Sequence, residues 1–146
     1  MTIAGFTGTR NGMTKLQKVS FKKLSCVTIS ELHLGDCIGS DADAYHLFNG
    51  KKIGHPPTDN IKRAFLKYDE ERESKPYLER NRDIVNETDT LIATPDGKEI
   101  KRSGTWATIR YARKKNKEII IIEPNGTFTF YVQQELVQHI QKFTSK

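Results

Sequence analysis

The sequence predicts an α/β fold: a Rossmann-like, open and mainly parallel sheet flanked by helices. Residues 90–94 and 119–122 are short apolar runs rich in β-branched side chains, and a proline follows each run within two positions. A polar loop and a helix-length segment separate the runs, as expected for buried parallel strands joined by a crossover helix. The 146 residues suit one domain with its own core, so we expect a single domain over residues 1–146.

A candidate anion site lies at the start of the crossover helix. Ser103 is a good N-cap, and Gly104 and Thr105 would open the helix with free backbone N–H groups. In open α/β sheets, ligands bind at the carboxyl edge of the strands, where this helix begins. The position predicts a phosphate or carboxylate site, although the local sequence alone favours an ordinary capped helix.

The first strand and helix repeat this arrangement. Residues 2–6 predict a strand, and Thr14 with Gln17 forms a capping box ahead of a helix. In the loop between them, Gly8 would allow close backbone approach and Arg10 would supply positive charge to a phosphate or ribose. The same loop could be a simple turn. The helix side chains that we expect to face the core are Leu16, Val19 and Leu24.

A second strand, predicted over residues 27–34, leads into a loop of small and acidic residues at positions 35–44. Its two glycines leave room for a ligand, and Ser40 or Asp41 would cap the next helix, which continues to about residue 48. Acids in a first turn interact favourably with the helix dipole, and we give Asp43 that role alone.

The acids of this loop indicate where a phosphate would not bind. A carboxylate and a phosphate a few ångströms apart in a partly desolvated cleft would cost on the order of a few kcal/mol. A phosphate therefore fits the acid-free helix start at Ser103, whereas Asp36 and Asp41 suit sugar hydroxyls or the amino groups of a base. A metal ion bridging acid and phosphate would reverse this inference.

The histidines give weaker signals. Residues 53–54 predict a brief third strand broken by prolines, and His55 at its end could reach the cleft, although packing is the commoner role. His33 falls within the second strand and His46 within the helix after it. Neither has a partner in the sequence that suggests a metal site, so we expect no metal.

The middle and end of the chain are less informative. Residues 60–76 are charge-dense and predict a solvated surface loop or frayed helix that could act as a lid. In a helix predicted over residues 77–88, Asn81 shares a face with apolar side chains and needs hydrogen-bond partners from loop backbone or a ligand. Arg80 and Arg82 could pair with phosphate or with nearby acids. The last predicted elements are an edge strand over residues 127–132 and a helix over residues 133–143.

Composition limits the class of partner. The formal net charge is +6, but the basic clusters are dispersed and lack interleaved aromatic residues, which disfavours a nucleic-acid interface. No apolar run reaches the length of a membrane span and the N-terminus lacks a secretory pattern, so we expect no membrane partner and a cytoplasmic location. Cys26 and Cys37 lack metal-site spacing and are expected to be free thiols.

Four segments, in this order, resemble the SLOG superfamily of Rossmann-like nucleotide-binding proteins, and within it the small stand-alone proteins of the YspA/YpsA type. They are residues 5–10, residues 33–42, Arg80 with Asn81, and Pro95 with residues 103–105. The resemblance implies an open parallel sheet with a nucleotide-derived ligand at its carboxyl edge. Together with the loop patterns, it suggests as ligand-binding residues Gly8, Thr9, Arg10, Gly35, Asp36, Cys37, Gly39, Ser40, Asp41, His55, Arg80, Asn81, Pro95, Ser103, Gly104, Thr105 and Trp106.

Members of that superfamily have several activities. They include Lonely Guy phosphoribohydrolases, which cleave a base from a nucleoside monophosphate, molybdenum-cofactor carriers, DprA single-strand binders and antiviral sensors of NAD-derived signals. The phosphoribohydrolases carry a Pro-Gly-Gly-x-Gly-Thr-x-x-Glu motif with a catalytic glutamate. Here an insertion separates Gly97 from Gly104, and Thr108 stands where the glutamate would be. A threonine cannot stabilise an oxocarbenium-like centre as a carboxylate does, which argues against that activity.

Three functions remain open. The first is a binding protein for a nucleotide-derived small molecule, acting as a sensor, carrier or sequestering protein, in which Trp106 stacks on a base or packs in the core. The second is an N-glycosidase or phosphoribosyl-type enzyme that uses Asp36 or Asp41. The third, a nucleic-acid binder, is supported only by net charge and one superfamily relative. No cofactor other than the nucleotide-derived ligand is expected, and the resemblance is compatible with a homo-oligomer.

Overall fold

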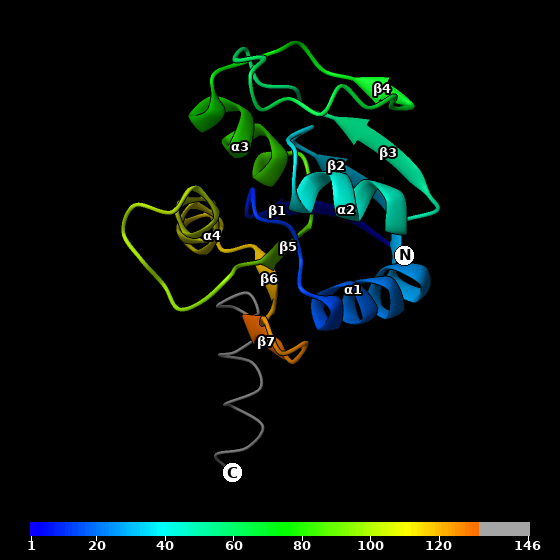
Figure 1. Cartoon of the computed structure of the whole chain (residues 1–146), viewed down its shortest axis with the longest axis vertical. Coiled ribbons are helices and arrows are strands. Elements are labelled where there is room, and N and C mark those ends of the chain that lie inside the picture. The colour runs from blue at the N-terminus through cyan, green and yellow to red at the C-terminus, as the bar shows by residue number, and fades with distance from the viewer. Residues whose placement is uncertain (132–146) are drawn as a thin grey trace.

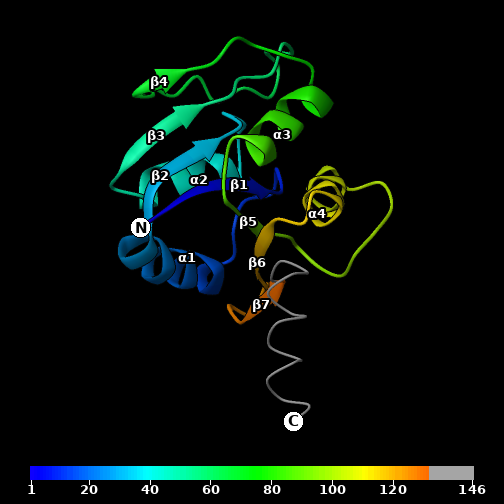
Figure 2. The same ribbon diagram turned by 180° about the vertical axis from the view of Figure 1, so that it is seen from behind.

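A seven-stranded sheet forms the centre of the molecule, with helices α1 and α2 on one face and α3 and α4 on the other (Figure 1; Figure 2 shows the reverse side). The structure is a computed structural model, and it describes residues 1–131. The strands are β1 (Thr2–Gly8), β2 (Ile29–Leu34), β3 (Lys51–Gly54), β4 (Glu70–Glu71), β5 (Thr90–Thr94), β6 (Glu118–Ile122) and β7 (Phe128–Tyr131). The helices are α1 (Lys15–Thr28), α2 (Ser40–Leu47), α3 (Tyr77–Asn86) and α4 (Gly104–Lys114).

The strand order is β4-β3-β2-β1-β5-β6-β7, and every neighbouring pair is parallel except β6 with β7. From β1 the chain builds outward through β2, β3 and β4, and then returns through α3 to β5 on the other side of β1. The strand order therefore reverses between β1 and β5. In open α/β sheets this switch point leaves a crevice at the carboxyl ends of the strands, where ligands bind. The predicted α/β, Rossmann-like, mainly parallel sheet is confirmed.

The isoleucine run of β6 shows how the sheet is buried. Ile119 and Ile121 join the core cluster that packs under α4, whereas Ile120 and Ile122 join the cluster on the α1 and α2 side. Side chains alternate between the faces of a strand, and both faces here are covered by helices. For this reason β6 has a continuous apolar run and not an alternation of apolar and polar residues.

The face that α1 turns toward the core differs from the prediction. Leu16 and Val19 are 55% and 50% exposed, and Leu24 is only partly buried against the core. Phe21 is buried instead and meets Phe6 edge-to-face at 5.6 Å between ring centroids. Gln17 is also buried, and its Nε2 donates to two backbone carbonyl oxygens, at 2.8 Å and 2.9 Å. A polar residue thus occupies the inward stripe because it satisfies carbonyls at the strand ends, and the predicted capping box is confirmed.

Several predicted boundaries move. Helix α1 continues to Thr28, so β2 begins two residues later than predicted, and β3 begins at Lys51 rather than at residue 53. The 60–76 segment is not a frayed helix, because it contains β4, which pairs in parallel with β3. The predicted edge strand is confirmed as β7, antiparallel to β6, while the predicted helix at 133–143 lies outside the described residues. Within residues 1–131, no helix combines the length and the apolar character that crossing a membrane requires.

Candidate functional site

A cavity of about 190 Å³ lies at the switch point between β1 and β5. It is bounded by the end of β1, the loop after β2, the start of α2, the inner face of α3 and the first turn of α4. Nine of the predicted ligand-binding residues line it: Gly8, Arg10, Gly35, Cys37, Asp41, Arg80, Asn81, Gly104 and Thr105. The remaining lining residues are Phe6, Thr7, Tyr77 and Ile84.

Gly8 forms the floor of the cavity because no side chain fits there. A Cβ at this position would lie 2.4 Å from Ser40 Cβ and 2.5 Å from Thr94 Oγ1. The loop is fixed from α2, where the Ser40 N–H donates to the Thr9 carbonyl oxygen at 2.9 Å. Gly39 has a φ of 91° and packs so closely on this loop that a Cβ would lie 2.3 Å from the Arg10 carbonyl oxygen. The two glycines therefore let three backbone segments meet.

Four buried hydroxyls near the carboxyl edge of the sheet have no hydrogen-bond partner among the described residues. Thr9 Oγ1, Ser40 Oγ, Thr94 Oγ1 and Tyr77 Oη are all inaccessible and unpaired in the described part of the chain. Most buried polar side-chain atoms in proteins have a hydrogen-bond partner, so four unpaired hydroxyl groups are unusual. Of these four residues only Tyr77 lines the cavity, while Ser40 and Thr94 lie directly behind Gly8. The predicted ligand residues Thr9, Gly39 and Ser40 are thus not part of the lining.

Asp41 is the buried acid of the cavity. Desolvation raises the pKa of its carboxyl from 3.8 to about 6, and this outweighs the opposing attraction of Arg80. Its Oδ2 accepts a hydrogen bond of 3.2 Å from the Cys37 N–H. Burial, followed by the charge of Asp41, also raises the pKa of the Cys37 thiol, which makes it a poor nucleophile. A carboxyl that titrates near neutrality inside a cavity is a common feature of functional sites.

The Arg80 side chain connects two loops to α3 through hydrogen bonds. Its Nη1 donates to the Gly35 carbonyl oxygen and, at 3.2 Å, to the His55 carbonyl oxygen, and its Nε donates to Asn81 Oδ1 at 2.7 Å. It thereby ties the carboxyl ends of β2 and β3 to α3. Its Nη2 contacts only the Cys37 sulfur, at 3.7 Å, among the described residues. Arg80 is almost fully buried, but it still forms part of the cavity wall.

The structure gives Asp36 a structural role in place of the predicted one. Its carboxylate is fully buried and accepts from Arg63 Nε at 2.7 Å, Tyr68 Oη at 2.9 Å and the Leu66 N–H at 3.0 Å. It anchors the segment between β3 and α3 and does not line the cavity. Both Asp36 oxygens accept hydrogen bonds within the protein, so neither is left for a sugar hydroxyl or for catalysis.

Other predicted ligand residues also lie outside the cavity lining. Trp106 packs in the core under α4, the Pro95 carbonyl accepts from Gln17, and Ser103 caps α4 by accepting from the Trp106 N–H at 3.2 Å. His55 is buried beneath the site and faces His33. Of the two roles considered for Trp106, the structure shows core packing.

A second hollow, of about 680 Å³, opens between α3 and α4 and shares Tyr77, Asn81 and Gly104 with the cavity. Its wall is basic, and apart from the residues shared with the cavity, only Arg82 was considered as a possible phosphate contact. The positions 107, 108, 111, 114 and 115 recur at helical spacing on one face of α4, a pattern that helical periodicity could have identified. The cations that line this basic groove are Arg82, Arg110, Lys114 and Lys115.

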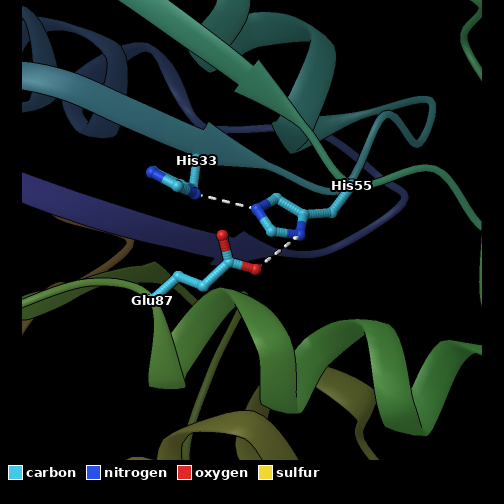
Figure 3. Close-up of side chains that lie close together, drawn as sticks. All are labelled: His33, His55 and Glu87. Carbon is cyan, nitrogen blue, oxygen red and sulfur yellow. Dashed lines mark hydrogen bonds and ion pairs between the residues drawn. The ribbon is translucent and has the colours of Figure 1, made fainter. Parts of the chain in front are cut away.

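The expectation that His33 has no partner is wrong. His33 Nδ1 lies 2.8 Å from His55 Nε2, and His55 Nδ1 lies 3.8 Å from a carboxylate oxygen of Glu87 (Figure 3). Burial above all, with the charges of Arg72 and Arg80 adding to it, lowers the pKa of His55 to about 3. His55 and Glu87 follow His33 by 22 and 54 positions and lie after β3 and at the end of α3, so no local motif could have revealed the cluster.

Comparison with known proteins supports the fold. A scan of family models and a search of curated proteins found no match to this sequence. Among solved structures, the chain is similar to the molybdenum cofactor binding protein from the phototrophic bacterium Rippkaea orientalis, with a TM-score of 0.62. The two chains are 17% identical, and the match covers 99% of this chain and 97% of the other. At this identity the likeness shows a shared Rossmann-like α/β fold, and the SLOG resemblance remains a prediction.

Proposed function

We propose that this protein binds a phosphate-containing, nucleotide-derived small molecule in the switch-point cavity and acts as a sensor or sequestering protein. The observation that carries the proposal is the cavity lining, which brings the Gly8 floor, the cations Arg10 and Arg80 and the Asp41 carboxyl together with the opening turn of α4. Together they provide hydrogen-bonding groups for an oxygen-rich ligand and a partial positive charge for an anion.

The charges of the site suggest the ligand's orientation. The first turn of α4 holds no acid, whereas the first turn of α2 holds Asp41 and Asp43. A phosphate is therefore best accommodated by Gly104 and Thr105, with Arg10 as the nearby cation. Asp41 would accept hydrogen bonds from a ribose hydroxyl or from a base amino group.

The basic groove extends the proposed ligand. A cavity of about 190 Å³ is small for a whole nucleotide, but it adjoins the 680 Å³ hollow between α3 and α4, with which it shares Tyr77, Asn81 and Gly104. Arg82 and Lys114 in this hollow have no carboxylate partner among the described residues. A ligand with a second anionic group or a second nucleoside, such as ADP-ribose, NAD or a cyclic dinucleotide, would use both spaces.

A second candidate function is cleavage of an N-glycosidic bond, and the raised pKa of Asp41 favours it. A carboxyl with a pKa of about 6 can donate a proton to a leaving base near neutral pH. Thr108, which occupies the position of the catalytic glutamate in the phosphoribohydrolase motif, cannot act as this acid. Thr108 is buried, and its hydroxyl donates to the Gly104 carbonyl oxygen at 3.0 Å.

One experiment tests both functions. Melting temperatures would be measured with nucleoside monophosphates, NAD, ADP-ribose and its cyclic forms, cyclic dinucleotides and the molybdenum cofactor that the structural neighbour binds, and products would be followed chromatographically. A ligand at a hundred times its dissociation constant should add about 2.7 kcal/mol to the free energy of unfolding. A stabilising ligand recovered intact supports binding, and release of free base supports cleavage. If none of these compounds stabilises the protein, the proposal fails.

A further inference from the structure

His33, His55 and Glu87 form a second cluster of functional groups, separate from the cavity (Figure 3). His33 lies on β2, His55 directly follows β3, and Glu87 is the C-cap of α3. Both histidines are 2% exposed, whereas the Glu87 side chain is 35% exposed. One nitrogen of each ring and one carboxylate oxygen all lie within 4.8 Å of one another. The cluster therefore combines two buried ligand atoms with one that faces solvent.

The hydrogen bonds of this cluster leave His55 Nδ1 without a partner at hydrogen-bond distance among the described residues. Glu31 Oε2 lies 2.8 Å from His33 Nε2 and can only accept, so this nitrogen carries the proton. In the neutral ring of His33, Nδ1 is then a lone pair that accepts from His55 Nε2 at 2.8 Å. His55 Nδ1 is a lone pair in turn, and it faces Glu87 Oε2 at 3.8 Å.

The length of that last contact is informative. If His55 carried a proton on each nitrogen, a charge-assisted bond of about 2.7–2.9 Å to the carboxylate would be expected. The observed 3.8 Å is too long for a hydrogen bond and places two electron-pair donors opposite each other. Glu87 Oε2 is therefore not hydrogen-bonded to His55 and can turn to an ion held by the two facing ring nitrogens, His33 Nδ1 and His55 Nε2.

Neighbouring groups hold the cluster in a ligand-like orientation. Arg72 Nε donates to Glu87 Oε1 at 2.9 Å and leaves Oε2 turned toward His55, while Glu31 fixes His33. A carboxylate on the far nitrogen of a histidine is the usual support for a metal-bound imidazole. Glu31 and Glu87 also supply two negative charges, which match a divalent ion. Of the cations near the cluster, Arg72 and Lys51 are paired with carboxylates, and Arg80 donates to the His55 carbonyl oxygen.

We propose that His33, His55 and Glu87 bind a divalent transition-metal ion of the zinc class. Two imidazoles and one carboxylate, with a fourth position open to water, are a common zinc donor set. Tetrahedral ligands about 2.1 Å from an ion lie about 3.4 Å apart. The His33–His55 contact would open from 2.8 Å toward that distance, and the half-exposed Glu87 would move toward the ring.

The ion would join β2, β3 and the end of α3. It would also act near the cavity, because the His55 carbonyl oxygen accepts from Arg80, which lines the cavity wall. The metal site is independent of the proposed nucleotide function, since it needs neither the cavity nor a nucleotide.

The test is titration of the chelator-treated protein with ZnCl₂ by calorimetry, and with CoCl₂ by visible absorption. We expect one ion per chain, tetrahedral cobalt bands and a higher melting temperature with Zn²⁺. Glu87→Gln removes the anionic ligand, while its amide can still accept from Arg72 and can donate to His55 Nδ1. This variant should fold and bind Zn²⁺ at least about 10-fold more weakly.

Glu79→Gln provides the matched control, because Glu79 is an exposed acid in the first turn of the same helix. It should bind Zn²⁺ as the wild type does. The proposal is overturned if the wild type shows no saturable uptake, if the cobalt spectrum is that of the hydrated ion, or if the two variants lose affinity equally.

Discussion

Replacing Asp41 with asparagine should stabilise the protein at neutral pH, even though the residue lies in the proposed binding site. The buried carboxyl has a pKa of about 6 in the folded chain, against 3.8 ordinarily. The folded state therefore binds more protons than the unfolded state between pH 3.8 and 6, and stability falls as pH rises through this window. One pKa unit corresponds to about 1.4 kcal/mol, so ionised Asp41 costs about 3 kcal/mol above pH 6.

Asparagine has the shape of the neutral acid and keeps an oxygen that can accept from the Cys37 N–H. The free energy of unfolding would be measured by urea denaturation from pH 4 to pH 8 for the wild type and Asp41→Asn. The variant should be more stable by about 2–3 kcal/mol at pH 8 and about equal at pH 4. Titration of other groups, His55 among them, is common to both proteins and cancels in the difference.

Asp43→Asn is the control for this prediction. Asp43 lies in the same first turn but accepts from the Met13 N–H at 2.9 Å and pairs with Lys18, so its replacement should bring no gain at pH 8. A difference between wild type and Asp41→Asn that does not change with pH would refute the reasoning, as would a less stable variant at pH 8. If the prediction holds, the acid is kept at a cost in stability, as is common for functional groups.

Three further substitutions test how the site is supported, each by urea denaturation. Gly8→Ala should cost about 1–3 kcal/mol, because its Cβ would lie 2.4 Å from Ser40 Cβ; equal stability would show that the floor is loosely packed. Asp36→Asn should cost about 3 kcal/mol through the lost ion pair with Arg63, and its φ of 55° suits asparagine, so backbone strain cannot explain a loss. Gln17→Leu should cost about 1–3 kcal/mol by leaving two carbonyl oxygens unpaired, and a gain in stability would contradict that role.

The sequence was sufficient for those parts of the fold that depend on local pattern. The β5–α4–β6 unit followed from two apolar runs and an N-cap, and the start of α4 lies at the cavity as expected. Gly8 and Gly104 were found for the same reason, since a glycine where a strand ends or a helix starts marks an edge at which ligands approach. Local signals of this kind need no knowledge of which strands are neighbours.

Three other features were missed because they depend on contacts between distant parts of the chain. His33 and His55 meet only because β2 and β3 are adjacent and aligned, with His33 opposite Ile53. Asp36 could be recognised as an anchor only once Arg63 and Tyr68 were known to fold back onto it. Gln17 was passed over because hydrophobic periodicity assigns polar residues to solvent, and carbonyls near the strand ends reverse that preference.

The most direct test of the proposed binding site uses two glycines that both tolerate a side chain. A Cβ at Gly104 or at Gly97 meets no atom within 4 Å, but only Gly104 lines the cavity. Melting temperatures of the wild type, Gly104→Leu and Gly97→Leu would be measured with and without AMP, NAD and ADP-ribose. We predict that at least one nucleotide stabilises the wild type and Gly97→Leu but not Gly104→Leu. Equal stabilisation of all three proteins, or stabilisation of none, would contradict a nucleotide site at the switch point.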